Sequence, residues 1–220
     1  MHIPDGYLGP ATCGVFYAVM LPIWALASRI VKKTLKARQV PMLAIGAAFS
    51  FVIMMFNVPI PGGTTGHAVG GVLVAILLGP WAACIAITVA LVIQALLFGD
   101  GGITAIGANC FNMAFVLPFA GYYIYKAISY NAPRGSNRRV IAAGIAGYIA
   151  LNIAAGLTGF EFGIQPLLHK TASGQALYCP YGLNVALPVM LGEHLIVFGW
   201  VEAIVTGLVV KYLQKHENYY

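Results

Sequence analysis

The sequence predicts an all-α integral membrane protein, and three observations lead to that prediction. Of its 220 residues, 60% are hydrophobic and only 8% are charged, and the mean hydropathy is +0.84. Soluble domains carry about 25% charged residues. The apolar residues come in long runs separated by Gly-rich breaks, which favours helices over a barrel, the other architecture that satisfies the backbone in lipid. We expect a single membrane domain over 1–220, with an N-terminal segment (1–10) and a bundle of seven helices (11–220).

The charges favour a membrane protein over a nucleic-acid-binding one. A net charge of +6 would suggest nucleic acid as a partner of a soluble protein. Here the Lys and Arg residues gather in a few short loops, where they act as topology signals. The expected environment is therefore the lipid bilayer, with no nucleic acid partner.

The first half of the chain holds four predicted helices. The second is followed by an uncharged linker, 58–66, with two prolines and three glycines. The apolar stretch 67–98 is too long for one span of about 20 residues, and Gly79-Pro80 divides it because proline cannot continue a helix interior. The predicted helices are 11–30, 41–57, 67–78 and 81–98.

The second half holds three longer helices. A Gly-rich turn at 99–102 precedes the first of them, and a long connection, 160–181, precedes the last. The last helix carries three ionisable residues: Glu193, His194 and Glu202. The predicted helices are 104–126, 140–159 and 182–212.

The short third helix decides the topology. Its 12 residues cover roughly 18 Å, short of the hydrocarbon core of about 30 Å. If it crosses, all of the 12 Lys and Arg residues except Lys170 fall on the cytoplasmic side. The positive-inside rule therefore favours seven crossings, with the N-terminus outside and inserted into the bundle and the C-terminus in the cytoplasm.

The first two residues form a metal-chelating sequence. We expect Met1 to be retained, because removal of the initiator methionine needs a small second residue and His2 is large. The α-amine, the His2 backbone nitrogen and the His2 ring can then bind one ion through a five-membered and a six-membered ring. Nothing could precede Met1 in such a site. The alternative is that 1–10 is a disordered start.

His67 can supply a fourth nitrogen, because the predicted topology places it on the same side as Met1 and His2. Four nitrogens in a plane suit Ni(II) or Cu(II), whereas Zn(II) prefers tetrahedral N and S ligands. At a helix start the positive end of the dipole disfavours imidazolium, so the ring should stay neutral. The alternative is that His67 caps the helix by hydrogen bonding.

Four other acidic or imidazole residues are weaker candidates. Asp5 is a candidate acceptor for the second ring N–H of a ligating histidine, or it forms an Asx-type turn with Gly6. Glu193, His194 and Glu202 suggest a second metal or proton site, because ionisable residues inside a membrane are often functional. They form no HExxH motif, and neighbours such as 193 and 194 point to different helix faces.

Four stretches of the sequence form a recognisable set: MHIPDGYLGP, MMFNVPIPGGTTGH, LLGPWAA and FGDGGITAIGANCFNM. They resemble the NikM/CbiM family, the substrate-binding membrane subunits (S components) of energy-coupling factor transporters for nickel and cobalt. The resemblance implies seven transmembrane helices and a metal held by Met1, His2 and His67. It also implies a prokaryotic cell membrane, a transmembrane scaffold subunit and two cytoplasmic ATPases as partners, and it leaves the need for a small accessory membrane subunit open.

The expected function is uptake of Ni²⁺ as the transported substrate, with no catalysis by the chain itself. The N-terminal motif with TTGH is more similar to the nickel-type members, and Co²⁺ is the alternative substrate. The chain has no Walker A sequence, so energy from ATP must come from a partner. A stand-alone secondary permease and an intramembrane metalloenzyme remain as competing hypotheses.

Overall fold

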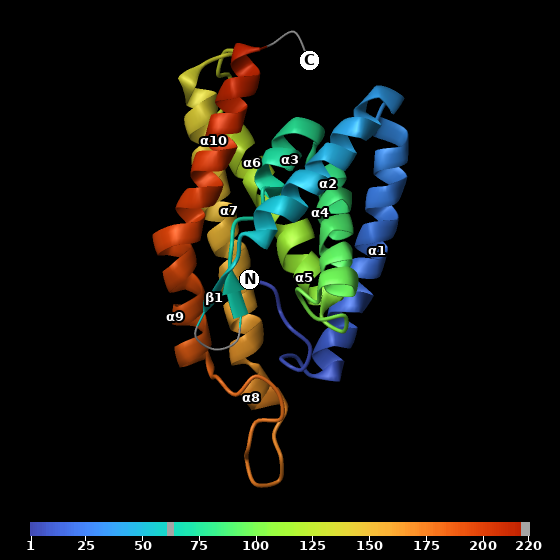
Figure 1. Ribbon diagram of the computed structural model, residues 1–220, viewed down its shortest axis with the longest axis vertical. Helices are drawn as coiled ribbons and strands as arrows, with labels where there is room; N and C mark the ends of the chain where they lie inside the picture. Colours follow the sequence, from blue (N-terminus) through green and yellow to red (C-terminus); the bar gives the residue numbers. More distant parts are fainter. Residues whose placement is uncertain (61–63, 217–220) are drawn as a thin grey trace.

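The computed structural model describes residues 1–60 and 64–216. The chain forms an elongated bundle of helices, in which α1 lies on one side and α9 and α10 on the other (Figure 1). The N-terminus lies in the middle of the bundle, whereas the C-terminal helix ends at one tip of the molecule (Figure 1). The interior therefore receives the first residues of the chain.

The elements of the first half follow the apolar runs closely. The predicted break at Gly79-Pro80 is present, since α3 ends at Leu78 and α4 begins at Pro80. The elements are α1 (Pro10–Thr34), the 3₁₀ turn η1 (Ala37–Gln39), α2 (Val40–Met55), β1 (Val58–Ile60), β2 (Thr64–Gly66), α3 (Gly71–Leu78), α4 (Pro80–Ile93) and the π-helix η2 (Gln94–Phe98).

The second half consists of long helices, two of which contain a π-helical turn. The predicted connection 160–181 is partly helical, because α7 runs on to Gly163 and α8 follows it. The elements are α5 (Ile106–Asn109), the π-helix η3 (Cys110–Val116), α6 (Leu117–Ile128), α7 (Asn137–Gly163), α8 (Gln165–Leu168), α9 (Leu183–Glu193), the π-helix η4 (His194–Phe198) and α10 (Gly199–Lys215).

The linker contains a hairpin that was not predicted, and the predicted start of the third helix at residue 67 is wrong. In this antiparallel hairpin Val58 pairs with Gly66 and Ile60 with Thr64; residues 61–63 of the linker lie outside the described part. His67 does not open the third helix, because α3 begins only at Gly71. Gly70 precedes it with φ of +73°, a left-handed conformation that suits glycine. Residues 67–70 thus form an elbow between β2 and α3, and the helix-start argument for His67 does not apply.

Among the described residues, five helical segments are long and apolar enough to cross a membrane: Pro10–Thr34, Ala37–Met55, Pro80–Phe98, Asn137–Leu168 and Leu183–Lys215. The other two predicted crossings differ from these. Helix α3 has 8 residues, which span roughly 12 Å, and α5–η3–α6 carries buried Asn109 and Asn112 within its apolar sequence. The count of seven crossings therefore stays a prediction.

The basic loops lie together at one end of the bundle. The α1–α2 turn, the α6–α7 loop and the end of α10 gather at the top of Figure 1, and the loop after α8, which holds Lys170, lies at the opposite end. This distribution agrees with the segregation of charge in the sequence. The side of the membrane that each end faces stays a prediction.

Candidate metal centre

The first three residues are buried in the bundle and held by hydrogen bonds from several elements. Met1 and Ile3 have no exposed surface, and His2 is 4% exposed. The Asn109 side chain pairs with the Ile3 backbone in both directions, accepting from its N–H at 2.8 Å and donating to its carbonyl at 3.1 Å. The Thr64 hydroxyl donates to the His2 carbonyl at 3.1 Å. These contacts fix the backbone on both sides of the His2 ring.

The His2 ring is oriented by Gln94, the first residue of η2. The Gln94 amide donates to the Phe51 carbonyl at 3.4 Å, which turns its oxygen toward His2 Nε2 at 3.2 Å. Nε2 must then carry the proton, and Nδ1 keeps its lone pair. Nδ1 is buried without a hydrogen-bond partner and lies 3.4 Å from Asp100 Oδ1. Two acceptors that face each other in this way leave a place for a cation.

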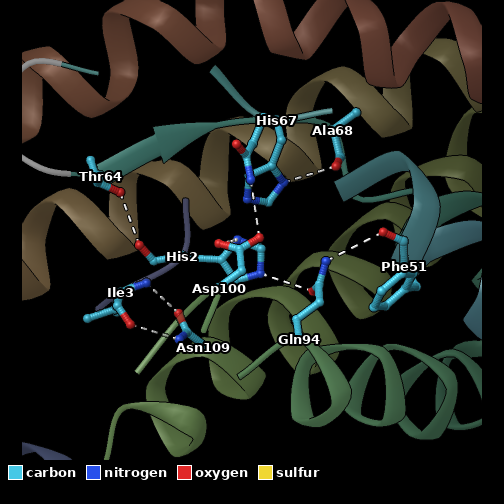
Figure 2. A network of polar contacts seen from close by, with 10 residues as sticks. His2, Ile3, Phe51, Thr64, His67, Ala68, Gln94, Asp100 and Asn109 are labelled. Carbon is cyan, nitrogen blue, oxygen red and sulfur yellow. Dashed lines mark hydrogen bonds and ion pairs between the residues drawn. The ribbon is translucent and has the colours of Figure 1, made fainter. Parts of the chain in front are cut away.

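His67 shows the same division between its two ring nitrogens. Its Nδ1 lies 3.0 Å from the Ala68 carbonyl oxygen and so carries the proton, while its Nε2 is buried without a partner. The ring centroids of His67 and His2 are 4.5 Å apart, and the rings are tilted by 32°. The two rings meet beside Gln94 and Asp100 (Figure 2). A backbone carbonyl that fixes the tautomer of a histidine is a common support for a metal ligand.

Burial keeps the nitrogen bases of this pocket neutral. It lowers the pKa of the Met1 amine from 8.0 to about 5, against the opposing charges of Glu193 and Asp100. It lowers the pKa of His2 to about 3, helped by the nearby amine, and lowers the pKa of His67 well below 6.5 for the same reasons. At neutral pH these groups thus offer lone pairs rather than protons. Burial also raises the pKa of Asp100.

Asp5 is hydrogen-bonded to the loop before α5, and its support of a ligating histidine stays a prediction. Its carboxylate accepts from the Ile103 and Thr104 backbone N–H groups at 3.1 and 2.9 Å, and from the Thr104 hydroxyl at 2.5 Å. These bonds lower the pKa of Asp5, and the bond from the Thr104 hydroxyl has the largest effect. Asp5 therefore ties the N-terminal segment to the loop before α5.

The three ionisable residues of the last helix do not form one site. Glu202 accepts hydrogen bonds from the elbow 67–70, whereas Glu193 Oε1 lies 3.0 Å from His194 Nδ1. Over residues 1–60 and 64–216 no group of three or more His, Cys, Asp or Glu residues is arranged to hold a metal ion. A metal site in this part of the chain thus needs ligands of another kind, such as the amine and the backbone amide nitrogen.

Comparison with known families decides the kind of protein. The family CbiM, described as the cobalt uptake substrate-specific transmembrane region, matches residues 2–219. The chain belongs to this family. CbiM proteins are membrane components of metal uptake systems and not enzymes, so the predicted absence of catalysis and the predicted resemblance are confirmed. The chain is a multi-pass member of this transmembrane family.

Relatives named for nickel and relatives named for cobalt both match this chain; a cobalt transport protein, CbiM, of Streptococcus sanguinis is 35% identical over 89% of this chain and 80% of its own length. The chain is 52% identical to a probable fused nickel transport protein, LarMN, of Lactiplantibacillus plantarum, and 54% identical to a fused nickel transport protein, NikMN, of Rhodobacter capsulatus. Each match covers 98% of this chain but only 65% and 62% of the two relatives, which are longer. A crystal structure of a truncated transition metal transporter superposes with a TM-score of 0.94 at 56% identity, covering 98% of this chain and 99% of the other.

Sequence reasoning missed one residue that shapes this pocket. Gln94 is buried and orients His2, and the signal for it was an isolated amide within the apolar run 81–98. Asn109 and Glu202 were visible as polar residues in helices. Their partners, Ile3 and the elbow 67–70, lie more than a hundred residues away in sequence, so their roles become clear only in the fold.

Proposed function

We propose that this chain is the substrate-binding subunit of an energy-coupling factor transporter that takes up Ni²⁺. The ion is bound by four nitrogens: the Met1 amine, the His2 backbone nitrogen, His2 Nδ1 and His67 Nε2. The proposal requires a free amine at Met1, and in it the N-terminal segment (1–10) closes the site from the outer side.

The observation that carries the proposal is the pair of unpartnered ring nitrogens in a closed pocket. His2 Nδ1 and His67 Nε2 are both buried without a hydrogen-bond partner, although each ring donates its other N–H to a fixed oxygen. Leaving such a group unsatisfied costs about 1–3 kcal/mol. A metal ion that accepts both lone pairs removes this cost and places positive charge beside Asp100.

The ligand set favours nickel over the alternative substrate, cobalt. Binding through a backbone nitrogen requires loss of the amide proton, and four nitrogens in one plane suit Ni(II) or Cu(II). The two relatives named for nickel are 52% and 54% identical to this chain, which supports the same assignment. Relatives named for cobalt match at 35–37% identity, and the family description also refers to cobalt. Co²⁺ remains the alternative substrate of the same site.

Delivery of the ion into the cell is assigned to partner subunits. The chain has no Walker A sequence, so we assign ATP hydrolysis to two cytoplasmic ATPases joined through a transmembrane scaffold subunit, with or without a small accessory membrane subunit. The expected location is the cell membrane of a prokaryote, with the N-terminus outside and the C-terminus in the cytoplasm. The basic loops at one end of the bundle support this orientation.

The absorption spectrum of the purified protein loaded with Ni(II) tests the ligand set. A yellow, planar-type band is expected for four nitrogens, and a pale green octahedral spectrum would contradict the proposed site. Transport in liposomes tests the partners. Uptake at the full rate by this chain alone, without ATPases, would favour the secondary permease instead.

A further inference from the structure

The elbow 67–70, which carries His67, is held by side chains from other helices. Its apolar side chains, Ala68 and Val69, are at most 2% exposed, and His67 is fully buried. Ser50 of α2 donates its hydroxyl to the Val69 carbonyl. The Phe198 ring of η4 packs so closely on Gly66 that a Cβ there would lie 2.1 Å from a ring carbon. The position of His67 therefore depends on several elements rather than on a regular helix of its own.

Glu202 of α10 makes the densest of these contacts. Its Oε2 accepts from the Val69 and Gly70 backbone N–H groups, both at 2.8 Å, and its Oε1 lies 3.1 Å from the Gly70 nitrogen. The side chain has no exposed surface. One carboxyl group thus satisfies two buried N–H groups that precede α3, at a point where the left-handed Gly70 ends the elbow.

The position of Glu202 is itself fixed by close packing against α7. A Cβ placed on Gly147 would lie 3.3 Å from Glu202 Cγ and 3.3 Å from the Glu202 carbonyl oxygen. Helix α7 therefore approaches α10 at a glycine, and the Glu202 side chain has little freedom to move away from the elbow. A carboxyl group buried this deeply is costly in a membrane protein unless its contacts are specific.

We infer that Glu202 is a positioning residue for the metal site: it holds the elbow 67–70 so that His67 Nε2 faces the His2 ring. It does not ligate the ion. This inference rests on the proposed function, because the geometry that Glu202 maintains matters only if His67 is a ligand.

The test is Glu202→Gln in the full-length protein, with Ni(II) chloride as the probe. The amide keeps the size of the side chain, but its NH₂ group faces the elbow N–H groups as a second donor. Loss of a partner that orients a ligand typically lowers metal affinity 10- to 100-fold, and we expect a loss in that range together with a changed planar-type band. Glu161→Gln is the matched control, because Glu161 is also a buried carboxyl group but pairs with Asn112.

Three outcomes separate the possibilities. Unchanged affinity and an unchanged band in Glu202→Gln would overturn the inference while leaving the proposed function intact. Absence of a planar-type band in the unmodified protein would instead contradict the proposed function. If Glu202→Gln does not fold, Glu202→Asp keeps the acceptor oxygens but withdraws them by one methylene; an intermediate loss of affinity supports the inference, and an affinity equal to that of the unmodified protein overturns it.

Discussion

Two histidines of this protein are both buried and both have Nδ1 beside a backbone carbonyl, yet only the His67 ring lies next to the His2 ring. His67 and His194 are both fully buried. In each, Nδ1 lies within 3.0 Å of a backbone carbonyl oxygen and Nε2 has no partner. His194 also has the Glu193 carboxylate 3.0 Å from its Nδ1. The His67 ring lies 4.5 Å from the His2 ring, whereas the ring neighbour of His194 is Phe198 at 5.6 Å. A buried nitrogen with a free lone pair is therefore not enough for a metal site, because a second possible ligand must lie close to it.

The difference between the two histidines follows from where the chain places them. His194 is the first residue of a π-helical turn, and its Nδ1 bonds the carbonyl of Met190 in the preceding turn. His67 lies outside any helix, on the elbow 67–70. An elbow can present a ring to the inserted N-terminal segment, because its direction is set by contacts such as that of Glu202. A helix fixes the direction of a side chain more locally.

The largest effect should come from the other half of the proposed site, the Met1 amine. Acetylation of the amine, or one added residue before Met1, removes a ligand and adds atoms in a pocket where Met1 has no exposed surface. We expect Ni(II) binding to be abolished, as measured by competition with a coloured chelator. A tag of equal size at the C-terminus is the control. Full affinity of the acetylated chain would contradict a metal site that includes the Met1 amine.

Paired substitutions test the comparison directly. His67→Ala should lower Ni(II) affinity at least 100-fold, which corresponds to about 2.8 kcal/mol or more. His194→Ala should change the affinity less than about threefold, although it removes an equally buried side chain. Thermal unfolding of the two metal-free variants controls for general damage. Equal losses of affinity in both variants would contradict the difference between the two histidines and indicate that His194 is a further ligand.

A smaller effect is expected at the residue that orients the His2 ring, which faces His67. Gln94→Leu keeps much of the volume but removes the oxygen that fixes His2 Nε2. We expect a 10- to 100-fold loss of affinity, the range for partners that orient ligands. Asn152→Leu is the control, because the Asn152 amide also donates to a backbone carbonyl but within its own helix, to Tyr148. Isothermal titration with Ni(II) measures both, and equal effects would contradict an orienting role for Gln94.

The elements of the fold were predictable where local sequence decides them. Apolar runs bounded by basic loops gave α1, α2, α4 and α7 to within a few residues, and proline gave the break before Pro80. The start of α3 was not predictable, because it depends on Glu202, which lies 133 residues from Val69 in sequence. The hairpin of β1 and β2 was missed for a similar reason, since three-residue strands are too short to show a period.

The candidate site was predictable only in its chemistry. The order of amine, amide and imidazole at Met1 and His2 follows from covalent structure, so it was visible in the sequence. The contact that orients the His2 ring comes from Gln94, which is distant in sequence, and it was not visible there. The bonds of Asp5 to the backbone N–H groups of residues 103 and 104 were not visible in the sequence either, because they join positions about a hundred residues apart.

The pH dependence of binding tests the ligand set without any change of residue. Between pH 6 and pH 8 the Met1 amine, with a pKa of about 5, and His2, with a pKa of about 3, are already neutral in the metal-free protein. Only the His2 amide then loses a proton on binding, so the affinity should rise about tenfold per pH unit.

Below pH 5 the amine takes up a proton in the metal-free protein, so the dependence should steepen as the pH falls. His194→Ala should leave the whole profile unchanged, because His194 is not among the proposed ligands. Ni(II) titrations at fixed ionic strength measure the slope. A flat profile between pH 6 and pH 8 would indicate a carboxylate such as Asp100 in place of the amide nitrogen, and a profile that changes in His194→Ala would show that both buried histidines take part in binding.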